Sequence, residues 1–468
     1  MDSSSPPSFH VKHIAIIGAG PTGLAAAKYL RAQSAFDSIT IFEQQEQVGG
    51  VWNYSDAAPK IYQVPQEDPF QPPDSPIVCP TSETPLFLTP MYFDLHTNIP
   101  STLMNFSDQS FPKDTNIFPS RQDIHQYLLD YAQDVRHLIK LCFQVVSLSL
   151  VRDNGKDSWR LRAQSTTDAR VIDTIYDAVV IANGHYNLHF IPEIKNIKSF
   201  QEAHPTIITH SKQYRKADAF NGKKTIIVGN GPSGLDIAFQ VNQTSKGKTL
   251  LSTRTATPAD KLAHTACEEV PEIEEFLVEE RGVRFKNGRV ETEVDLIMFC
   301  TGFLFSYPFL HDLQRQLLST GLGLHGLYQH LFCIRYPTLV FPVVALKVVP
   351  WPLAEAQAAV VAGVWSNNLK LPAVQEMQDW SKQLEIYKGQ SLHLMDLFED
   401  GLYMNSLHDW AVQANHLVKK PPRWNDEHFW IRGLYKEAKM LFEQQGGAAK
   451  SLAELGLIYS PEQSHGLS

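Results

Sequence analysis

Three glycines near the N-terminus, Gly18, Gly20 and Gly23, have the spacing Gly-x-Gly-x-x-Gly. The first glycine of such a loop allows a tight turn, the second lets a pyrophosphate approach the backbone, and the third lets a helix pack closely. A β-branched apolar run precedes the loop, and an Ala- and Leu-rich helical pattern follows it. The amides that begin such a helix face phosphate groups. The sequence therefore predicts a dinucleotide site whose phosphate contacts are Gly18, Gly20, Pro21, Thr22 and Gly23.

A carboxylate, Glu43, closes the next predicted strand, residues 38–42. A carboxylate at this position accepts hydrogen bonds from a ribose diol and repels a 2′-phosphate. The strand, the loop, the helix and the acid together favour dinucleotide binding over a merely structural glycine turn.

The same loop occurs a second time, at Gly229, Gly231 and Gly234, again between a β-branched run and a helical pattern. Ser233 stands at the start of this second helix. It is predicted to contact a pyrophosphate, and its hydroxyl could also cap the helix. The sequence therefore predicts two dinucleotide units in one chain.

The second unit differs from the first at the end of its second strand, residues 249–252. Arg254 and Thr255 follow that strand, where the first unit has an acid. An arginine can bind a 2′-phosphate, which favours NADP over NAD, although a solvated surface arginine is the alternative. One unit suited to a ribose and one suited to a ribose phosphate imply hydride transfer from NADPH to a bound FAD.

The two loops predict an α/β fold with two Rossmann-like domains in the 468-residue chain. Glycine-containing segments at residues 183–186 and 300–303 mark where the chain leaves the first domain and returns to it. We expect the NADPH-binding domain to be inserted into a larger FAD-binding domain that ends in C-terminal helices. The FAD-binding parts are residues 1–200 and 301–468, and the NADPH-binding part is residues 201–300.

Apolar periodicity predicts helices over residues 122–135 and 427–445. Residues 144–151 and 158–163 are predicted to form paired strands. The most apolar stretch, residues 338–365, contains prolines and two charged residues. This pattern predicts buried strand and turn rather than a membrane span.

The composition, 43% hydrophobic and 19% charged, is that of a globular protein with large cores. A net charge of −9 without a basic stripe disfavours a nucleic-acid partner. No Cys-x-x-Cys occurs among the five cysteines, which disfavours a disulfide framework, a metal site and a dithiol redox centre. The N-terminal residues lack the pattern of a signal peptide, so a soluble cytoplasmic protein is expected. The cysteines are Cys79, Cys142, Cys267, Cys300 and Cys333.

Further short motifs stand around the two loops. They are Gly49-Gly-Val-Trp52, Leu95-His-Thr-Asn-Ile-Pro100, Leu103-Met-Asn-Phe-Ser-Asp108, Asn183-Gly-His-Tyr186, Phe299-Cys-Thr-Gly-Phe303, Tyr336-Pro-Thr-Leu339 and Glu355-Ala-Gln-Ala358. In this order and spacing, the motifs resemble those of the flavin-containing monooxygenases, a group within the class B flavoprotein monooxygenases. The resemblance covers nearly the whole chain and is to the soluble fungal or microbial type.

One motif departs from that family. The family fingerprint is Phe-x-Gly-x-x-x-His-x-x-x-Tyr, and here His210 and Tyr214 fit it. His204 and Thr206 stand at the Phe and Gly positions. The replaced residues shape a turn in the family, so we expect the fold to survive the change, while assignment to the best-studied subfamily is put in doubt.

The resemblance implies further site residues. Asn98 would be catalytic, because its amide offers donors and an acceptor to flavin, peroxide and nicotinamide, although an Asn before Ile-Pro is also a common turn residue. His185 and His210 are interpreted as structural rather than as proton shuttles. The remaining predicted flavin contacts are Gly50, Val51, Trp52, Thr97 and Gln357, with core packing as the alternative for Trp52.

The resemblance also implies a reaction, namely that of an NADPH-dependent FAD monooxygenase similar to the N,N-dimethylaniline monooxygenases. NADPH reduces the flavin, O₂ forms a C4a-hydroperoxyflavin, and one oxygen atom passes to an amine nitrogen or to a sulfide or thiol sulfur. A homodimer is the family's expected assembly.

Three alternatives stay open. A Baeyer–Villiger ketone monooxygenase uses the same flavin intermediate. A disulfide reductase is disfavoured because the sequence has no Cys-x-x-Cys, and a non-catalytic flavin-binding or sensor protein is disfavoured by the intact second loop.

Overall fold

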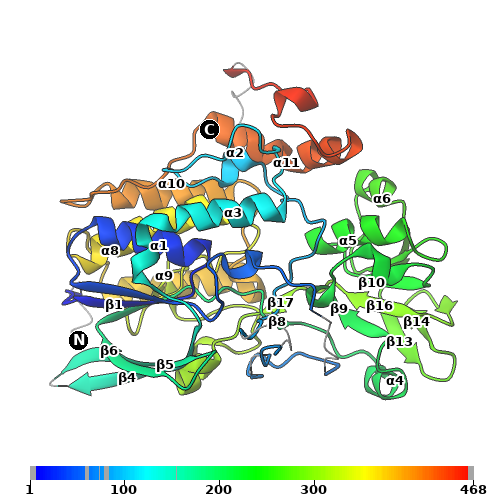
Figure 1. Ribbon diagram of the computed structural model, residues 1–468, viewed down its shortest axis with the longest axis horizontal. Helices are drawn as coiled ribbons and strands as arrows, with labels where there is room; N and C mark the ends of the chain where they lie inside the picture. Colours follow the sequence, from blue (N-terminus) through cyan, green and yellow to red (C-terminus); the bar gives the residue numbers. More distant parts are fainter. Residues whose placement is uncertain (1–6, 58–62, 73, 79–83, 154, 462–468) are drawn as a thin grey trace.

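The computed structural model describes residues 7–57, 63–72, 74–78, 84–153 and 155–461. These residues form two lobes, each built on its own parallel or mostly parallel sheet (Figure 1). The larger lobe carries both ends of the described chain, and the smaller lobe is formed by the middle of the sequence.

The larger lobe contains a seven-stranded sheet in the order β18-β19-β20-β7-β1-β2-β3. The strands from β20 through β3 are parallel, with β1 between β2 and β7. Its strands are β1 (His13–Ile17), β2 (Ser38–Phe42), β3 (Ile139–Lys140), β7 (Ala178–Ile181), β18 (Leu327–Tyr328), β19 (Phe332–Cys333) and β20 (Leu339–Val340).

Both faces of β1 are covered, which explains its apolar sequence. Ile14 and Ile16 pack into a core shared with α1 (Pro21–Ala32) and α8 (Pro350–Trp365). Ala15 and Ile17 pack into a second core on the opposite face. An antiparallel sheet covers that face, formed by β4 (Phe143–Asp153), β5 (Lys156–Ser165) and β6 (Val171–Tyr176).

The stretch of residues 338–365 corrects one prediction. Only β20 is a strand there, and residues 350–365 form the buried helix α8 instead of strand and turn. Pro350 and Pro352 stand in the first turn of α8, where backbone amides have no helical acceptor, so the prolines are tolerated. The Ala-rich sequence then continues the helix.

The smaller lobe contains a five-stranded parallel sheet in the order β12-β11-β10-β16-β9. Its strands are β9 (Ile208–His210), β10 (Thr225–Val228), β11 (Leu250–Thr253), β12 (Glu268–Pro271) and β16 (Leu296–Phe299). Helices α4 (Ile197–Ala203), α5 (Pro232–Asn242) and α6 (Ala259–Thr265) belong to this lobe, together with an antiparallel sheet (Figure 1). That sheet consists of β13 (Ile273–Leu277), β14 (Gly282–Phe285) and β15 (Val290–Glu291).

All strands of the smaller sheet fall between β7 and β18 in the sequence, so this lobe is an insertion into the larger one. The chain passes between the lobes along β8 (Leu188–His189) and β17 (Phe303–Leu304), which pair antiparallel. The α/β class with two Rossmann-like units is thereby confirmed. The domain boundaries at residues 200 and 300 stay predictions.

The remaining helices surround the larger sheet. Helices α3 and α11 lie where apolar periodicity predicted helices. Within the described ranges, no helix is long and apolar enough to cross a membrane. The remaining helices of the larger lobe are α2 (Ser101–Met104), α3 (Arg121–Tyr131), α7 (Gln314–Leu317), α9 (Val374–Lys388), α10 (Glu399–Ala411) and α11 (Asp426–Gln444).

Candidate functional site

The first glycine loop joins β1 to α1, and its backbone is packed too tightly for side chains. Gly18 has a φ of +104°, and a Cβ there would lie 2.4 Å from the carbonyl oxygen of Ala182, just after β7. A Cβ on Gly23 would lie 2.0 Å from the carbonyl oxygen of Gly18. The packing of the loop thus requires the first and third glycines, and their contacts with a cofactor stay predictions.

A second glycine segment faces this loop. A Cβ on Gly50 would lie 2.9 Å from the Cα of Gly20, so the two bare backbones form one narrow cradle. The Gly49 N–H donates to the carbonyl of Ala19 at 3.0 Å and fixes the approach. Gly50, Val51 and Trp52 form a single half-buried 3-10 turn. The structure therefore brings the predicted contact Gly50 next to Gly20, with Val51 and Trp52 in the same turn.

Helix α1 begins at this cradle. Gly20 is its N-cap residue and Pro21 its first residue, and no described side chain caps the helix. The amides of Thr22 and Gly23 therefore lack a helical acceptor. Unbonded backbone N–H groups next to glycine backbone without side chains can donate hydrogen bonds to a pyrophosphate group.

Glu43 is 5% exposed and ties the end of β2 to the loop. Its Oε2 accepts the N–H of Ala19 at 2.8 Å, and its Oε1 accepts the N–H of Gln45 at 2.9 Å. Burial raises the pKa of Glu43, while these backbone hydrogen bonds oppose the rise. Because each carboxylate oxygen has a second lone pair, the predicted ribose contact is compatible with both bonds.

Thr97 and Asn98 have opposite environments. Thr97 is buried, its N–H donates to the carbonyl of Pro119, and its hydroxyl donates to the carbonyl of Ile99, both at 2.9 Å. Asn98 is exposed, and its side-chain amide forms no hydrogen bond with another residue of the described chain. Thr97 is therefore held in place by the protein, while the side-chain amide of the neighbouring Asn98 is available to a ligand.

Two other predicted flavin contacts involve α8, because Gln357 is part of this helix and Trp52 packs against it. Gln357 is fully buried, its Oε1 accepts the N–H of Val343 at 2.7 Å, and its Nε2 donates to the Tyr403 hydroxyl at 3.1 Å. Protein partners thus use its oxygen and one N–H, which leaves one N–H for any flavin contact. Trp52 meets Trp351 edge-on, with ring centroids 6.4 Å apart, so packing is part of its role.

The second glycine loop repeats the geometry of the first. Gly229 has a φ of +107°, and a Cβ there would lie 2.8 Å from the carbonyl oxygen of Cys300. A Cβ on Gly234 would lie 2.0 Å from the carbonyl oxygen of Gly229. A Cβ on Gly231 would meet nothing within 4 Å, so the face above it is open. Ser233 is exposed, and the N-cap residue of α5 is Gly231, so the capping alternative for Ser233 does not apply.

Arg254 and Thr255 follow β11 at the surface. The Arg254 side chain is 84% exposed, and its Nε donates to Glu272 at 3.0 Å. The same carboxylate also binds Lys286, so two cations share one anion. Asn230, which sequence reasoning did not select, donates to the carbonyl of Thr255 at 2.8 Å. Asn230 therefore holds the segment after β11 against the second loop. Its position inside the glycine motif was the sequence signal that could have identified it.

The predicted structural histidines lie near the crossing between the lobes. His210 is fully buried, its Nδ1 accepts the N–H of Lys212 at 3.1 Å, and its Nε2 therefore donates to the carbonyl of Gly302 at 3.0 Å. Burial holds the pKa of His210 well below its usual range. Burial also lowers the pKa of His185 to about 4. The two hydrogen bonds of His210 agree with a structural role, and the role of His185 stays a prediction.

The altered fingerprint still forms a turn. His204 follows the end of α4, its Nε2 lies 2.9 Å from the carbonyl oxygen of Val278, and its own carbonyl accepts the N–H of Ile207 at 3.2 Å. Thr206 is exposed within this turn. The histidine ring therefore anchors the turn to the neighbouring sheet region, and neither replacement prevents β9 from forming.

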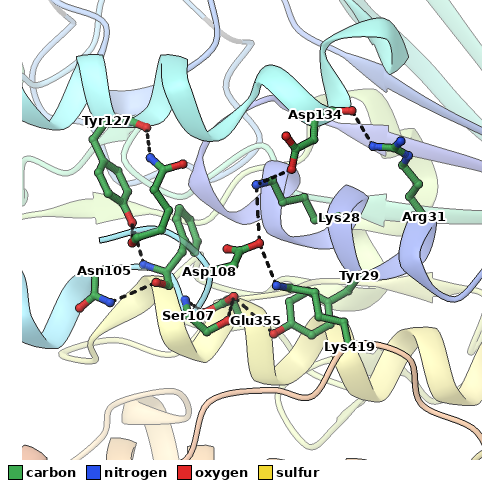
Figure 2. Close-up of polar contacts among 12 residues, drawn as sticks. Lys28, Tyr29, Arg31, Asn105, Ser107, Asp108, Tyr127, Asp134, Glu355 and Lys419 are labelled. Carbon is green, nitrogen blue, oxygen red and sulfur yellow. Dashed lines mark hydrogen bonds and ion pairs between the residues drawn. The ribbon is translucent and has the colours of Figure 1, made fainter. Parts of the chain in front are cut away.

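A buried carboxylate that sequence reasoning did not select lies on α8. Figure 2 shows Glu355 next to Ser107 and Tyr29. Ser107 donates its N–H at 2.8 Å and its hydroxyl at 2.7 Å, and the Tyr29 hydroxyl donates at 3.3 Å. Burial raises the pKa of Glu355, and the bonds from Ser107 oppose the rise. Glu355 thus joins α8, α1 and the segment after α2.

Two lysines surround the neighbouring Asp108 (Figure 2). Lys419 lies 2.9 Å and Lys28 3.7 Å from its carboxylate. Although burial opposes ionisation, these lysines hold the pKa of Asp108 below its usual range. Lys28 also contacts Asp134 at 3.1 Å and lies over the Tyr131 ring at 3.7 Å. Only the fold brings these residues together, so spacing in the sequence gave no signal.

Metal-binding and thiol groups do not gather in the described part of the chain. No cluster of three or more His, Cys, Asp or Glu side chains suited to a metal ion occurs there. Cys142, Cys267, Cys300 and Cys333 are free thiols, and Cys79 lies outside the described residues.

The two loops fit two dinucleotide cofactors. At the first loop, the cradle of Gly20 and Gly50 would be filled by any Cβ, and at the second the face above Gly231 is open. Both helices that follow begin without a side-chain cap, so their first amides are free for phosphate oxygens. The first loop could hold FAD, and the second NADPH.

Comparisons with known proteins agree with this site. The model of the flavin-binding monooxygenase-like family matches residues 87–265 and 264–392, and that of an NAD(P)-binding Rossmann-like domain matches residues 16–65. Flavin-containing monooxygenase FMO GS-OX-like 2 of Arabidopsis thaliana is 32% identical over 82% of this chain and 80% of its own. The thiol-specific monooxygenase of Saccharomyces cerevisiae is 30% identical over 77% of this chain and 78% of its own.

A solved structure supports the fold. The S-allyl-L-cysteine S-oxygenase from Allium sativum superposes with a TM-score of 0.76, covering 98% of this chain and 99% of that one at 24% identity. With the family models and the sequence relatives, the assignment is complete: this chain belongs to the flavin-binding monooxygenase-like family and is a flavoprotein monooxygenase with FAD and NADPH as cofactors.

Proposed function

We propose that this chain is an NADPH- and O₂-dependent monooxygenase that transfers one oxygen atom to a soft nucleophile of a small molecule, foremost a sulfur atom. When bound, FAD supplies the oxygen chemistry, which runs through a C4a-hydroperoxyflavin. A sulfur substrate is favoured over an amine because the yeast relative is named a thiol-specific monooxygenase. The cytoplasmic location and the homodimer expected from the sequence remain part of the proposal.

The observation that carries the proposal is the contrast between Thr97 and Asn98. The Thr97 backbone and hydroxyl are both bonded within the protein, whereas the Asn98 amide is exposed and has no bonded partner among the described residues. An amide in this state can donate to a flavin or nicotinamide oxygen and accept from a nicotinamide amide. Asn98 is therefore the proposed catalytic residue, with Thr97 holding it in place.

The other predicted residues bind and orient the cofactors. The amides of Thr22 and Gly23 would hold the FAD pyrophosphate, and Glu43 the ribose of FAD. Ser233, exposed at the start of α5, would contact the pyrophosphate of NADPH, and Arg254 its 2′-phosphate. The reaction needs few acid–base groups, because the cofactor forms the reactive oxygen.

Product analysis tests the proposal. The purified yellow protein is supplied with NADPH and O₂ and with a thioether, a thiol, a tertiary amine or a cyclic ketone. We expect oxygenated sulfur as the main product, with NADPH consumed in near-equal amount. A lactone from the ketone would instead indicate Baeyer–Villiger chemistry, and hydrogen peroxide as the sole product with every substrate would contradict the proposed sulfur oxygenation.

A further inference from the structure

The segment that bears Asn98 connects the two lobes. At its start, the Phe93 N–H donates to the carbonyl of Arg215 at 2.9 Å, which places it against the smaller lobe. At its end, the carbonyl of Leu95 accepts the N–H of Arg121 at 3.0 Å, and Thr97 is bonded to Pro119 in the larger lobe. A shift of one lobe relative to the other would therefore change the position of Asn98 relative to the smaller lobe.

The contact with the smaller lobe is strongest at Tyr92. Tyr92 is 5% exposed, and its hydroxyl donates to Oδ2 of Asp236 on α5, the helix that begins at the second glycine loop. Its ring meets the Tyr214 ring edge-on with centroids 5.2 Å apart. The Tyr214 hydroxyl donates to Gln240 at 2.9 Å, also on α5. Burial raises the pKa of Asp236, as expected of a carboxyl away from solvent.

We propose that Tyr92 and Asp236 are a positioning pair that aligns Asn98 with the nicotinamide nucleotide held at the start of α5. This inference rests on the proposed function. Asp236 and the exposed Ser233 lie in the first part of the same rigid helix, so a nucleotide that orders this helix also orders the Tyr92 contact. Misplacement of a reacting group by about 1 Å can cost ~100-fold in rate.

The test compares single-group variants by anaerobic reduction of the flavin with NADPH in the purified full chain. Tyr92→Phe removes only the hydroxyl, and Asp236→Leu removes the acceptor. We expect each to slow flavin reduction by at least about tenfold, or ~1.4 kcal/mol. The KM for NADPH should change far less than the rate, because the glycine loop is untouched. In the presence of O₂, the share of NADPH that ends as hydrogen peroxide should rise in parallel.

Two controls separate positioning from stability. Asp236→Asn keeps a carbonyl that accepts from Tyr92, so its rate should stay within about threefold of wild type. Tyr214→Phe removes the hydroxyl bond to the same helix but keeps the ring that packs against Tyr92, and should also stay near wild type. All variants are compared for FAD content and melting temperature.

The outcomes are distinct. Unchanged reduction rates in Tyr92→Phe and Asp236→Leu, or an equal loss in Tyr214→Phe, would overturn the inference. Loss of FAD from the first two variants alone would make the bond a folding contact and would overturn it as well. A wild type that NADPH reduces but that yields only hydrogen peroxide would contradict the proposed function, and the anaerobic rates would still judge the pair.

Discussion

Arg254→Ala is expected to lower the preference for NADPH over NADH by about 5- to 30-fold. Arg254 pairs with Glu272 at the surface, with side-chain exposures of 84% and 29%. Such a pair contributes ~0–1 kcal/mol, whereas a charge-assisted contact with a phosphate contributes ~1.5–3 kcal/mol. The difference spans ~0.5–3 kcal/mol, and the middle of this range, ~1–2 kcal/mol for the 2′-phosphate, gives the stated ratio.

The assay is kcat/KM for NADPH and NADH in wild type and variants at fixed low salt. Arg281→Ala is the matched control, because Arg281 is a surface arginine of the same lobe that pairs with Asp295 at 3.3 Å. Glu272→Gln removes the anion that competes with the phosphate and should raise the NADPH preference. An equal loss with both nucleotides in Arg254→Ala, or the same loss in Arg281→Ala, would refute the reasoning.

Three further predictions concern the site and its supports. Asn98→Ala should keep FAD but divert most NADPH oxidation to hydrogen peroxide, measured against product. Asn116→Ala, which removes only an amide bond to the carbonyl of Gly447 at 3.1 Å, should not. Glu355→Ala should lower the free energy of unfolding by ~1–3 kcal/mol in urea titrations, because the two hydrogen bonds from Ser107 and the one from the buried Tyr29 hydroxyl are lost; an unchanged value would contradict this. His330 is a buried residue between β18 and β19, and its Nδ1 lies 2.9 Å from Nδ1 of His393. Burial lowers the pKa of His330 from 6.5 to about 4. As the pH falls, the His330 side chain therefore takes up a proton in the unfolded chain before it does so in the folded protein. Its contribution to the free energy of unfolding is fully present above pH 6.5 and is lost toward pH 4, by up to ~1.4 kcal/mol per pH unit. His330→Gln should flatten that fall in urea titrations at several pH values.

Local spacing carried the prediction of both nucleotide units. Gly18 and Gly229 need positive φ, and Gly23 and Gly234 need room for the opposing carbonyl, so the residue types reveal the geometry. The prediction of strand and turn for the apolar run of α8 was wrong, because its prolines suggested turns although they stand in the first helical turn. Prolines mark a helix start as readily as a break.

The rest of the site depends on contacts between distant segments. Glu355 and Ser107, or Tyr92 and Asp236, lie far apart in the sequence, and no periodicity links them. Gln357 shows the reverse problem, because its motif indicated a flavin contact while the fold engages its amide with Val343 and Tyr403. Hydrogen-bond partners of this kind can be identified only once the three-dimensional arrangement of the strands and helices is known.

The most direct test of the central claim is oxygen incorporation from isotopically labelled O₂. Wild-type protein is incubated with NADPH and a thioether, and the product is analysed by mass spectrometry. We expect a sulfoxide that contains one labelled oxygen atom, formed in near-equal amount with NADPH consumed. An unlabelled sulfoxide, or NADPH oxidation that yields only labelled hydrogen peroxide, would contradict this expectation.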